Sequence, residues 1–301
     1  MKNKERIYYN EIKERLINDE IYSKVKDYSK ERHRVLTYFK VGKMLSEAGK
    51  HYGEDIIGKF SEKLMIDVGK KYNVRYLYDI RKFYIMFSNE KVPPVGALSW
   101  SHYRILMTIS DENERNYYIN RCITNHLTKR ELEDLKKNNE YKRLPKETKV
   151  KLIENKESNI KDLIKNPIVI KNINNYEIIS EKVLQRIILE DIPSFLEELG
   201  DGFTFIKNEY KIKIGSNYNY IDLLLYNIRY KCYVVIELKV TALKKEHIGQ
   251  IQTYMNYIDK NLKSINEDNT IGIIICKKDN KFIMDYCSDE RILSKEYELI
   301  T

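Results

Sequence analysis

The 301-residue sequence predicts an all-α first half followed by an α/β domain built on a mixed sheet. Apolar residues in the first half recur at helical spacing, and no clear strand pattern occurs before residue 165. Beyond residue 200, short runs rich in Ile, Val, Leu and Tyr predict strands, and one helical segment lies between the last two runs. Strands interleaved with helices are typical of a sheet covered by helices.

Seven amphipathic segments account for the first half. In the first segment, Ile7, Ile12 and Leu16 fall on one helical face, and similar patterns follow in the others. Thr128 with Glu131 fits a capping box, which predicts where the last helix begins. The predicted helices cover residues 5–17, 33–49, 54–72, 74–87, 99–109, 111–123 and 128–138.

Residues 138–175 form a polar stretch rich in Lys, Asn and Glu, with Pro145 and Pro167 inside it. Such a stretch is typical of a connector between domains. The chain is also long enough for two domains of ordinary size. We therefore predict a first domain over residues 1–150 and a second over residues 165–301.

The second domain is predicted to begin with one amphipathic helix, which is kinked near Pro193 and ends at Gly200. Three strands, a helix and a further strand follow it. These elements cover residues 203–215, 219–227, 231–240, 244–262 and 270–278. Their order predicts a mixed α/β sheet of modest size.

Several classes of protein are excluded by composition. No apolar run approaches the roughly 20 residues that a membrane-spanning helix needs, and the charged start of the sequence lacks a signal-peptide core. The four cysteines are scattered, as in the reduced thiols of a cytoplasmic protein. No glycine-rich phosphate-binding motif occurs, so no nucleotide cofactor is expected.

Positive charge is concentrated in the first half of the chain. Residues 1–160 hold 34 Lys and Arg against 24 Asp and Glu, whereas residues 161–301 hold 20 against 21. A basic half beside a neutral half favours a module that binds a polyanion. The alternative is a lysine-rich background composition of the genome, which would leave the same excess.

Residues 54–87 have the pattern of a helix, a short turn and a second helix. This pattern is compatible with a helix-turn-helix whose second helix meets a DNA groove. The second helix offers Arg75, Arg81 and Lys82, which we predict to bind DNA. The alternative is a helical interaction domain in which these charges are simply solvated.

Charged residues interrupt two apolar strands of the second domain. Glu237 and Lys239 are two residues apart in one strand and therefore face the same way, while Asp222 is isolated in the strand before it. If the two strands form a hairpin, Asp222 lies beside Glu237. Two adjacent carboxylates repel each other unless a cation such as Mg²⁺ lies between them. The alternative is a structural ion pair with Lys239.

Linked sequence blocks add a resemblance to a known family. In order, they are FLEELGDGFTF, YIDLLLYN, CYVVIELK and IGQIQTYM in the second half, with LSWSHYRIL and YNVRYLYDIRKFY in the first. Together they resemble the YhcG (DUF1016) family of nucleases, which is part of the PD-(D/E)XK superfamily. The resemblance covers most of the chain. It implies a restriction-endonuclease-like α/β fold for the second domain.

The resemblance also implies roles for individual residues. Asp222 and Glu237 would be metal ligands, with the backbone carbonyl of Leu238 as a third ligand. Lys239 would be the catalytic lysine, and Gln250 would contact the water shell of the metal or the DNA backbone. On the first helix of the domain, Glu181 is the choice for the helix acid of the superfamily, with Gln185 one turn away.

Two positions depart from the family pattern. Glu209 stands where the family often has a glutamine, and Leu127 replaces a tryptophan. Neither position belongs to the implied metal ligands. Glu209, however, could change the charge at the margin of the site.

These observations predict a cytoplasmic DNA endonuclease that depends on Mg²⁺ or Mn²⁺ and hydrolyses phosphodiester bonds. Branched DNA is a candidate substrate, and a defence or restriction system is a candidate context. One site cuts one strand, so symmetric duplex cutting would need a homodimer. The alternative is a non-catalytic DNA-binding or protein-interaction module on a nuclease fold.

Overall fold

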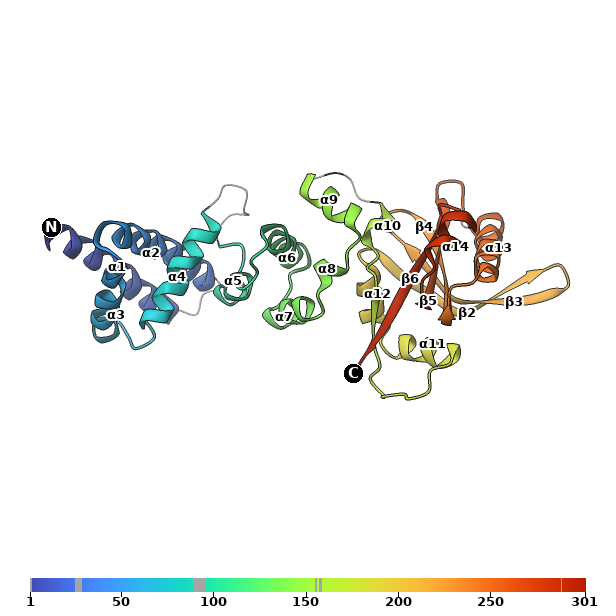
Figure 1. Cartoon of the computed structure of the whole chain (residues 1–301), viewed down its shortest axis with the longest axis horizontal. Coiled ribbons are helices and arrows are strands. Elements are labelled where there is room, and N and C mark those ends of the chain that lie inside the picture. Colours follow the sequence, from blue (N-terminus) through green and yellow to red (C-terminus); the bar gives the residue numbers. More distant parts are fainter. Residues whose placement is uncertain (1, 25–28, 89–95, 155, 157–158, 288) are drawn as a thin grey trace. The chain divides into compact units, whose positions relative to one another are not determined.

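The computed structural model describes residues 2–24, 29–88, 96–154, 156, 159–287 and 289–301. The chain divides into two compact units, Met1–Lys137 and Asn138–Thr301. Figure 1 shows that the described part of the first unit is helical and that the sheet lies in the second. The predicted fold class, an all-α region followed by a mixed α/β region, is therefore confirmed.

All seven predicted helices of the first unit form. Their bounds are α1 Lys2–Ser23, α2 Lys30–Tyr52, α3 Asp55–Asp67, α4 Val74–Phe87, α5 Trp100–Leu106, α6 Glu112–Asn125 and α7 Lys129–Lys137. The capping box before α7 is also confirmed. The Thr128 N–H donates to Glu131 Oε2 at 2.6 Å, and the Glu131 N–H donates to Thr128 Oγ1 at 3.3 Å. Two N–H groups that the helix leaves unsatisfied are thereby paired.

Helix α4 packs closely against α2. A Cβ on Gly42 of α2 would lie 2.4 Å from the carbonyl oxygen of Ile80, so only glycine permits this approach. The buried face of α4 carries the apolar residues Leu77, Ile80, Phe83 and Phe87. Its exposed face carries Arg75, Tyr78, Lys82 and Ile85, which recur at helical spacing.

The stretch predicted as a polar connector is in fact structured. Residues 138–175 contain α8 Glu140–Arg143, α9 Lys146–Glu154, α10 Ile160–Leu163 and β1 Ile168–Lys171. These elements are held to the second unit partly by buried charge. Arg143 Nη2 donates to Glu198 Oε1 at 2.9 Å, and Lys165 lies 3.6 Å from the same carboxylate. Short elements fixed by ion pairs leave little hydrophobic periodicity, which explains why the sequence did not predict these helices and this strand.

The single helix predicted over residues 180–200 forms as two helices, α11 Glu181–Glu190 and α12 Ile192–Leu199. Between them Asp191 leaves helical geometry, and its Oδ1 accepts the Ser194 N–H at 3.2 Å. Pro193 occupies the first turn of α12, where its missing N–H costs nothing. Gly200 ends α12, as predicted.

Six strands form one sheet in the order β1-β6-β5-β4-β3-β2. Strands β2, β3 and β4 are antiparallel neighbours, whereas β4, β5, β6 and β1 run parallel. The prediction omitted β1, β6 and the helix α14. The bounds are β2 Phe203–Ile214, β3 Asn217–Asn227, β4 Cys232–Ala242, α13 Lys245–Asn261, β5 Asp268–Lys278, α14 Lys281–Cys287 and β6 Ile292–Ile300.

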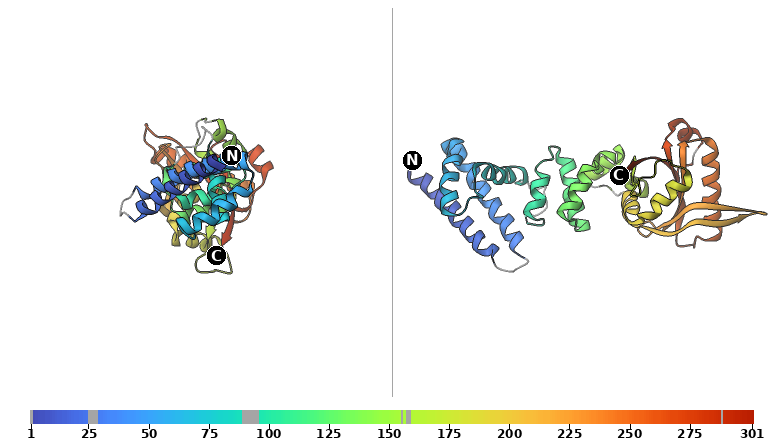
Figure 2. Two further views of the ribbon diagram at one scale, coloured as in Figure 1. Left: turned by 90° about the vertical axis from the view of Figure 1, so that its left-hand side faces the viewer. Right: turned by 90° about the horizontal axis from the view of Figure 1, so that it is seen from below.

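Each face of the sheet has its own hydrophobic core. Ile236 and Leu238 of β4 pack with residues of α11 and α12 on one face. Val235 of the same strand packs with Ile251 and Met255 of α13 on the other. Figure 2 shows α13 covering one side of the sheet. Because both faces are covered, the central strands are apolar on both sides, and any charge among them is costly.

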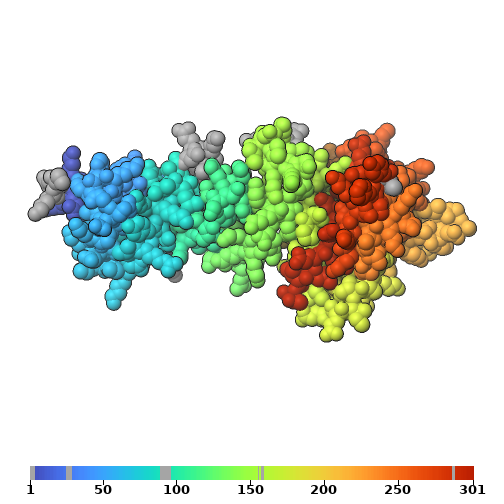
Figure 3. Space-filling model, in the orientation of Figure 1, coloured from blue at the N-terminus to red at the C-terminus, as the bar shows by residue number. Residues whose placement is uncertain are grey.

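Strands β3 and β4 separate partway along their length. Their pairing runs from Asn227/Cys232 to Leu223/Ile236 and stops there, whereas β3 remains paired with β2 as far as Asn217/Ile214. Residues 206–221 thus form a two-stranded projection, which we call the β2–β3 arm. The arm extends beyond the sheet in Figure 2 and protrudes from the second unit in Figure 3.

No helix among the described residues is long and apolar enough to cross a membrane.

Candidate active site

Asp222 and Glu237 lie where β3 and β4 separate. Each is the first residue beyond the last cross-strand pair, Leu223/Ile236. Beyond that pair, the backbone of β4 no longer bonds to the backbone of β3. The Leu238 N–H donates instead to Asp222 Oδ2 at 2.8 Å. The two carboxylates therefore come together by the hairpin that the sequence predicts, at a fork in the sheet.

Glu237 is a deeply buried carboxylate with only 2% of its surface exposed. Its Oε1 accepts hydrogen bonds from Lys239 Nζ at 2.8 Å and from Gln250 Nε2 at 2.7 Å. Its Oε2 is also buried, and no described residue donates a hydrogen bond to it. Burial, followed by the negative charge of Asp222, raises the pKa of Glu237 to about 7. One oxygen of this carboxylate thus accepts two hydrogen bonds, and the other receives none from the described residues.

Asp222 is a second carboxylate whose pKa is raised, chiefly by burial. The Leu238 N–H and the charge of Lys239 oppose that shift, and the charges of Glu181 and Glu209 add to it. Negative charges from several elements therefore act on Asp222, with one ammonium among them. Carboxylates with raised pKa values are typical of functional sites, including those that bind a cation.

Lys239 supplies the ammonium of the site. Its Nζ lies 2.8 Å from Glu237 Oε1 and 3.4 Å from Glu181 Oε2. Burial alone would lower the pKa of Lys239, but the hydrogen bond to Glu237 and the surrounding carboxylates raise it. Lys239 is therefore charged at neutral pH, and its position is fixed between β4 and α11.

Helix α11 contributes two residues one turn apart. Glu181, the predicted helix acid, is at the first turn and reaches Lys239. Gln185 is buried, and its Nε2 donates to the backbone carbonyl of Asp222 at 2.9 Å. Both residues therefore lie at the site but make different contacts there. Glu181 forms an ion pair with Lys239, and Gln185 donates a hydrogen bond to the backbone of Asp222.

Helix α13 contributes Gln250, as predicted, and two residues that the prediction did not include. Gln250 Nε2 also donates to Tyr254 Oη at 3.1 Å. His247 Nδ1 accepts the Lys244 N–H at 3.2 Å, and burial and the charge of Lys239 lower the pKa of this histidine. Positions 247, 250 and 254 lie on one helical face. The sequence already places His247 near Gln250, where a plain helix surface is the favoured interpretation, and the same spacing could have identified Tyr254.

Glu209 lies at the margin of the site, on the strand next to Asp222. The pairs Asn208/Leu223 and Tyr210/Ile221 flank it, so Glu209 stands opposite Asp222. Its backbone has φ 45°, a left-handed conformation that is unfavourable for a residue with a side chain. The charge of Glu209 adds to the raised pKa of Asp222, as we expected for an acid at this position.

The predicted DNA-binding residues lie in the first unit, on α4. Arg75 and Lys82 are exposed on the outer face of this helix. Arg81 instead forms a two-pronged ion pair with Glu54, in which Nη2 lies 2.9 Å from Oε1 and Nη1 contacts Oε2. Its charge is therefore already matched within the unit, whereas no described residue forms an ion pair with Arg75 or Lys82.

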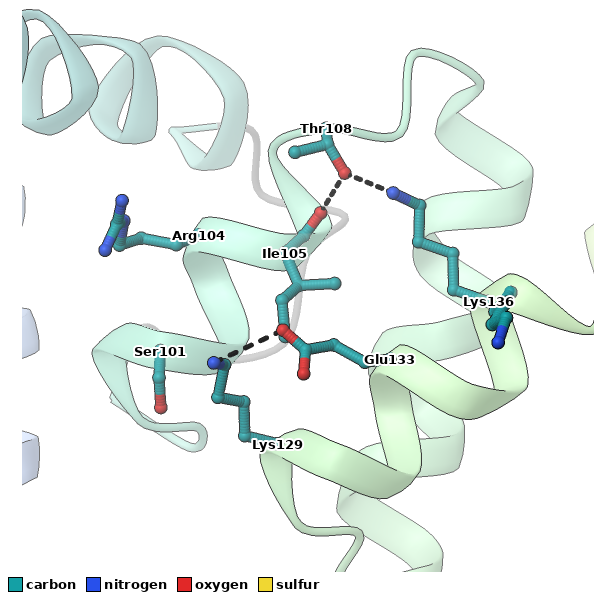
Figure 4. Close-up of a pocket in the computed structure, with 8 residues that line it drawn as sticks. Ser101, Arg104, Ile105, Thr108, Lys129, Glu133 and Lys136 are labelled. Carbon is teal, nitrogen blue, oxygen red and sulfur yellow. Dashed lines mark hydrogen bonds and ion pairs between the residues drawn. The ribbon is translucent and has the colours of Figure 1, made fainter.

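A basic pocket of about 520 Å³ lies elsewhere in the first unit, between α5 and α7. Figure 4 shows Lys136 reaching Thr108 Oγ1 and Lys129 paired with Glu133, at 2.6 and 3.3 Å. None of the predicted site residues lines it. The lining residues are Ser101, Arg104, Ile105, Thr108, Lys129, Glu133, Lys136 and Lys137.

The donor set at the fork fits a hard divalent cation. Among the described residues, no three His, Cys, Asp or Glu side chains converge as a metal site. Asp222 and Glu237 are therefore the two carboxylates that the described residues bring together at the fork for such an ion. This is a fit for Mg²⁺, which is bound through one or two carboxylates and keeps several waters. No described residue donates a hydrogen bond to the buried Oε2 of Glu237, and this observation favours a ligand at the fork.

We expect the metal-free protein to lose stability as the pH rises from 4.5 towards 7. Glu237 titrates near 4.5 in the unfolded chain and near 7 in the folded protein. Between these values only the folded state holds the proton, so rising pH favours unfolding, and the effect levels off above 7. Chemical denaturation with EDTA, at about pH 5 and about pH 7.5, would measure the loss in wild type and in Glu237→Gln. An equal loss in both would contradict the assignment.

Comparisons with known proteins identify a family for both halves of the chain. Residues 15–143 match the family model of the DUF1016 N-terminal domain, and residues 161–300 match that of the YhcG PDDEXK nuclease domain. The chain is 22% identical over 309 residues to the protein named "Putative nuclease YhcG" of Escherichia coli strain K12. That match covers 87% of this chain and 82% of the relative.

Two solved structures are also similar over part of the chain. They are a repair endonuclease from Pyrococcus abyssi and the EndoMS–dsDNA2 complex, each 19% identical, with TM-scores of 0.29 and 0.30. Each match covers 40% of this chain and about half of the solved chain, 48% and 47% respectively.

Proposed function

This chain belongs to the YhcG family, in which a DUF1016 N-terminal domain precedes a PDDEXK nuclease domain. From that premise we propose that the protein is a metal-dependent DNA endonuclease. The reaction is hydrolysis of a phosphodiester bond at the fork between β3 and β4. One observation carries the proposal. It is the buried Oε2 of Glu237, which lies beside Asp222 without a described hydrogen-bond donor.

In this proposal three groups hold the metal: the carboxylates of Asp222 and Glu237 and the backbone carbonyl of Leu238. In a strand, the N–H and C=O of one residue point to the same side. Because the Leu238 N–H points to Asp222, the carbonyl of Leu238 also faces the gap that β3 leaves. Mg²⁺ and Mn²⁺ both accept such oxygen ligands.

A divalent ion bound at the fork would supply an activated water and neutralise charge on the attacked phosphate. The chain's own residues do the positioning. Gln250 holds Glu237 Oε1, and Gln185 holds the backbone of Asp222. The charged Lys239 orients the attacking water or stabilises the negative charge that develops on the phosphate.

The alternative of a purely structural ion pair accounts for only part of the geometry. The pair between Lys239 and Glu237 uses Oε1 alone. It leaves Oε2 without a donor, and it leaves Asp222 with a raised pKa beside it. A pair formed only for structure would be expected to satisfy its buried oxygens.

Purified full-length protein should cut plasmid or branched DNA with Mg²⁺ or Mn²⁺ and should not cut with EDTA. Plasmid DNA and a four-way junction of the same sequence would be compared to identify the preferred substrate. The Asp222→Asn protein, purified in the same way, controls for contaminating nucleases. Binding without cleavage under every metal condition would instead support the non-catalytic alternative. Cutting both strands of a duplex at one position would call for two copies of the chain.

The first unit is proposed to bind the same DNA through Arg75 and Lys82 on the exposed face of α4. Arg81 is left out of this proposal because its charge is already paired with Glu54. Replacing Arg75 and Lys82 with alanine should weaken DNA binding. It should also reduce the slope of log affinity against log salt concentration, by an amount that corresponds to up to about two fewer released counterions. Arg81→Ala is the matched control, and an equal effect in the two proteins would contradict the assignment.

A further inference from the structure

The β2–β3 arm carries a basic and aromatic face. Lys211 pairs with Tyr220 across the two strands, and Lys213 pairs with Tyr218. Residues paired across antiparallel strands share a face, as do residues two apart in one strand. The four side chains therefore lie together on one side of the arm, and we call them the arm face.

The other side of the arm is fixed against the protein. Ile212 and Ile221 are buried in the core beneath α13. The arm face is consequently turned away from that core. Tyr218 and Tyr220 remain 55% and 51% exposed, which is unusual for two large neighbouring aromatic side chains. The arm face is thus a surface and not part of a core.

The charge of the arm face is not neutralised by the residues that the structure describes. Residues 206–221 contain three lysines and one acid, Glu209. Neither Lys211 nor Lys213 forms an ion pair with a described residue. Instead, their ammonium groups lie 3.8 and 5.8 Å from the ring centre of Tyr218. This contact orders the lysine stems and leaves the positive charge available to a partner.

A polyanion with phosphates is the partner that this chemistry fits. Lysine ammonium groups and tyrosine hydroxyls are both donors to phosphate oxygens in DNA complexes. The major groove of duplex DNA is wide enough to admit a two-stranded ribbon such as this arm. An apolar partner would leave both ammonium groups desolvated, which is unfavourable.

The arm also lies at a suitable distance from the fork. Tyr220 is two residues from Asp222 along β3, and Tyr218 is four residues away. At about 3.3 Å per residue these positions are roughly 7 and 13 Å from Asp222. Successive nucleotides of one strand are about 3.4 Å apart along the duplex axis. The arm face therefore reaches the two to four nucleotides next to the one at the fork.

We propose that the arm face is a duplex-binding subsite, in which Lys211 and Lys213 bind phosphates that flank the cleaved bond. This inference rests on the proposed nuclease function and specifies its substrate as double-stranded on the arm side of the cut. The subsite acts in binding and not in the chemical step, so its contribution should appear in affinity and KM.

The test compares Lys211→Ala/Lys213→Ala with wild type in the full-length chain. Binding to a labelled duplex is measured in EDTA over a series of salt concentrations. We expect the affinity to fall about tenfold or more at low salt. The slope of log affinity against log salt concentration should also decrease, by an amount that corresponds to about two fewer released counterions. Lys211→Arg/Lys213→Arg should restore binding. Lys171→Ala/Lys260→Ala removes the same charge from the end of β1 and the last turn of α13, and should change affinity less than about twofold.

The outcomes separate this subsite from the proposed function. If wild type binds and cuts duplex DNA and the arm variant binds it equally well, the subsite is wrong and the nuclease proposal stands. An equal loss on a single strand of the same length would overturn the duplex assignment. If wild type neither binds nor cuts DNA, both proposals fall. Matching melting temperatures of the variants establish that each protein is folded.

Discussion

Replacing Asp222 with asparagine is expected to lower the rate of DNA cleavage by a factor of about 10³ or more. The same substitution should not destabilise the metal-free protein. Asparagine keeps an oxygen that can accept the Leu238 N–H. The substitution also removes the negative charge that helps to raise the pKa of Glu237. The proposed metal site would lose a ligand, and the repulsion between the two carboxylates would be relieved.

Melting curves with EDTA and with excess Mg²⁺ would measure both effects. A ligand that binds only the folded state at 100 times its Kd stabilises it by about 2.7 kcal/mol. Wild type should show an increase of this kind, and Asp222→Asn should lose it while melting at the same or a higher temperature in EDTA. Glu209→Gln, which removes a nearby charge but no implied ligand, is the matched control.

The structural alternative makes the opposite prediction for this experiment. If the carboxylates served only to hold Lys239 in place, Asp222→Asn and Glu237→Gln would both melt lower in EDTA. Divalent ions would then change the melting of neither protein. That result would exclude the metal site, whatever the nuclease assay gave.

Replacing Lys239 with alanine should lower the cleavage rate by about 10² to 10⁴ while DNA affinity is retained. The ammonium lies 2.8 Å from Glu237, so it is placed to act on groups that bind there. Its removal also takes a favourable charge from Glu237, so metal affinity near neutral pH should fall somewhat. Single-turnover cleavage with saturating Mg²⁺ separates these two effects.

Lys239→Gln is a useful companion variant, because its amide can still donate to Glu237 without carrying charge. A rate equal to wild type in Lys239→Ala would remove the catalytic assignment. A rate that excess metal fully restores would show that Lys239 serves metal binding alone.

Much of the site could be predicted because it is local in sequence. Asp222, Glu237 and Lys239 are charged residues in apolar strands joined by a short turn, so the hairpin alone brings them together. Gln250 follows on the next helix and reaches Glu237 across the face that α13 covers. Such proximity follows from strand and helix geometry without knowledge of the whole fold.

The contribution of α11 could not be derived in this way. Gln185 precedes Asp222 by 37 residues and contacts its backbone carbonyl. The sequence around α11 does not show which of Gln185 and Glu181 contacts Asp222, because the two residues lie one turn apart on the same helix. Only the packing of α11 on the sheet decides which of the two reaches the backbone and which reaches Lys239.

The strands that the prediction omitted are explained by their surroundings. Strand β1 has four residues, and its partner β6 carries Lys295 and two glutamates within nine residues. Lys295 is nevertheless buried, and its Nζ donates to the Ile164 carbonyl at 3.0 Å. Because a buried position of β6 is occupied by a charged residue, the sequence of this strand does not alternate regularly between apolar and polar residues. The hydrogen bond that makes this burial possible is made to a residue distant in sequence, so it could not be predicted.

The arm has one further consequence, which concerns solubility. Strand β2 is the last strand of the sheet, so one row of its backbone N–H and C=O groups is open to pairing with another chain. Lysines on such an edge strand hinder strand addition and aggregation. Lys207, Lys211 and Lys213 lie on β2 and would serve this purpose even without DNA. Removing them should therefore promote self-association at high protein concentration, whereas arginine at the same positions should not.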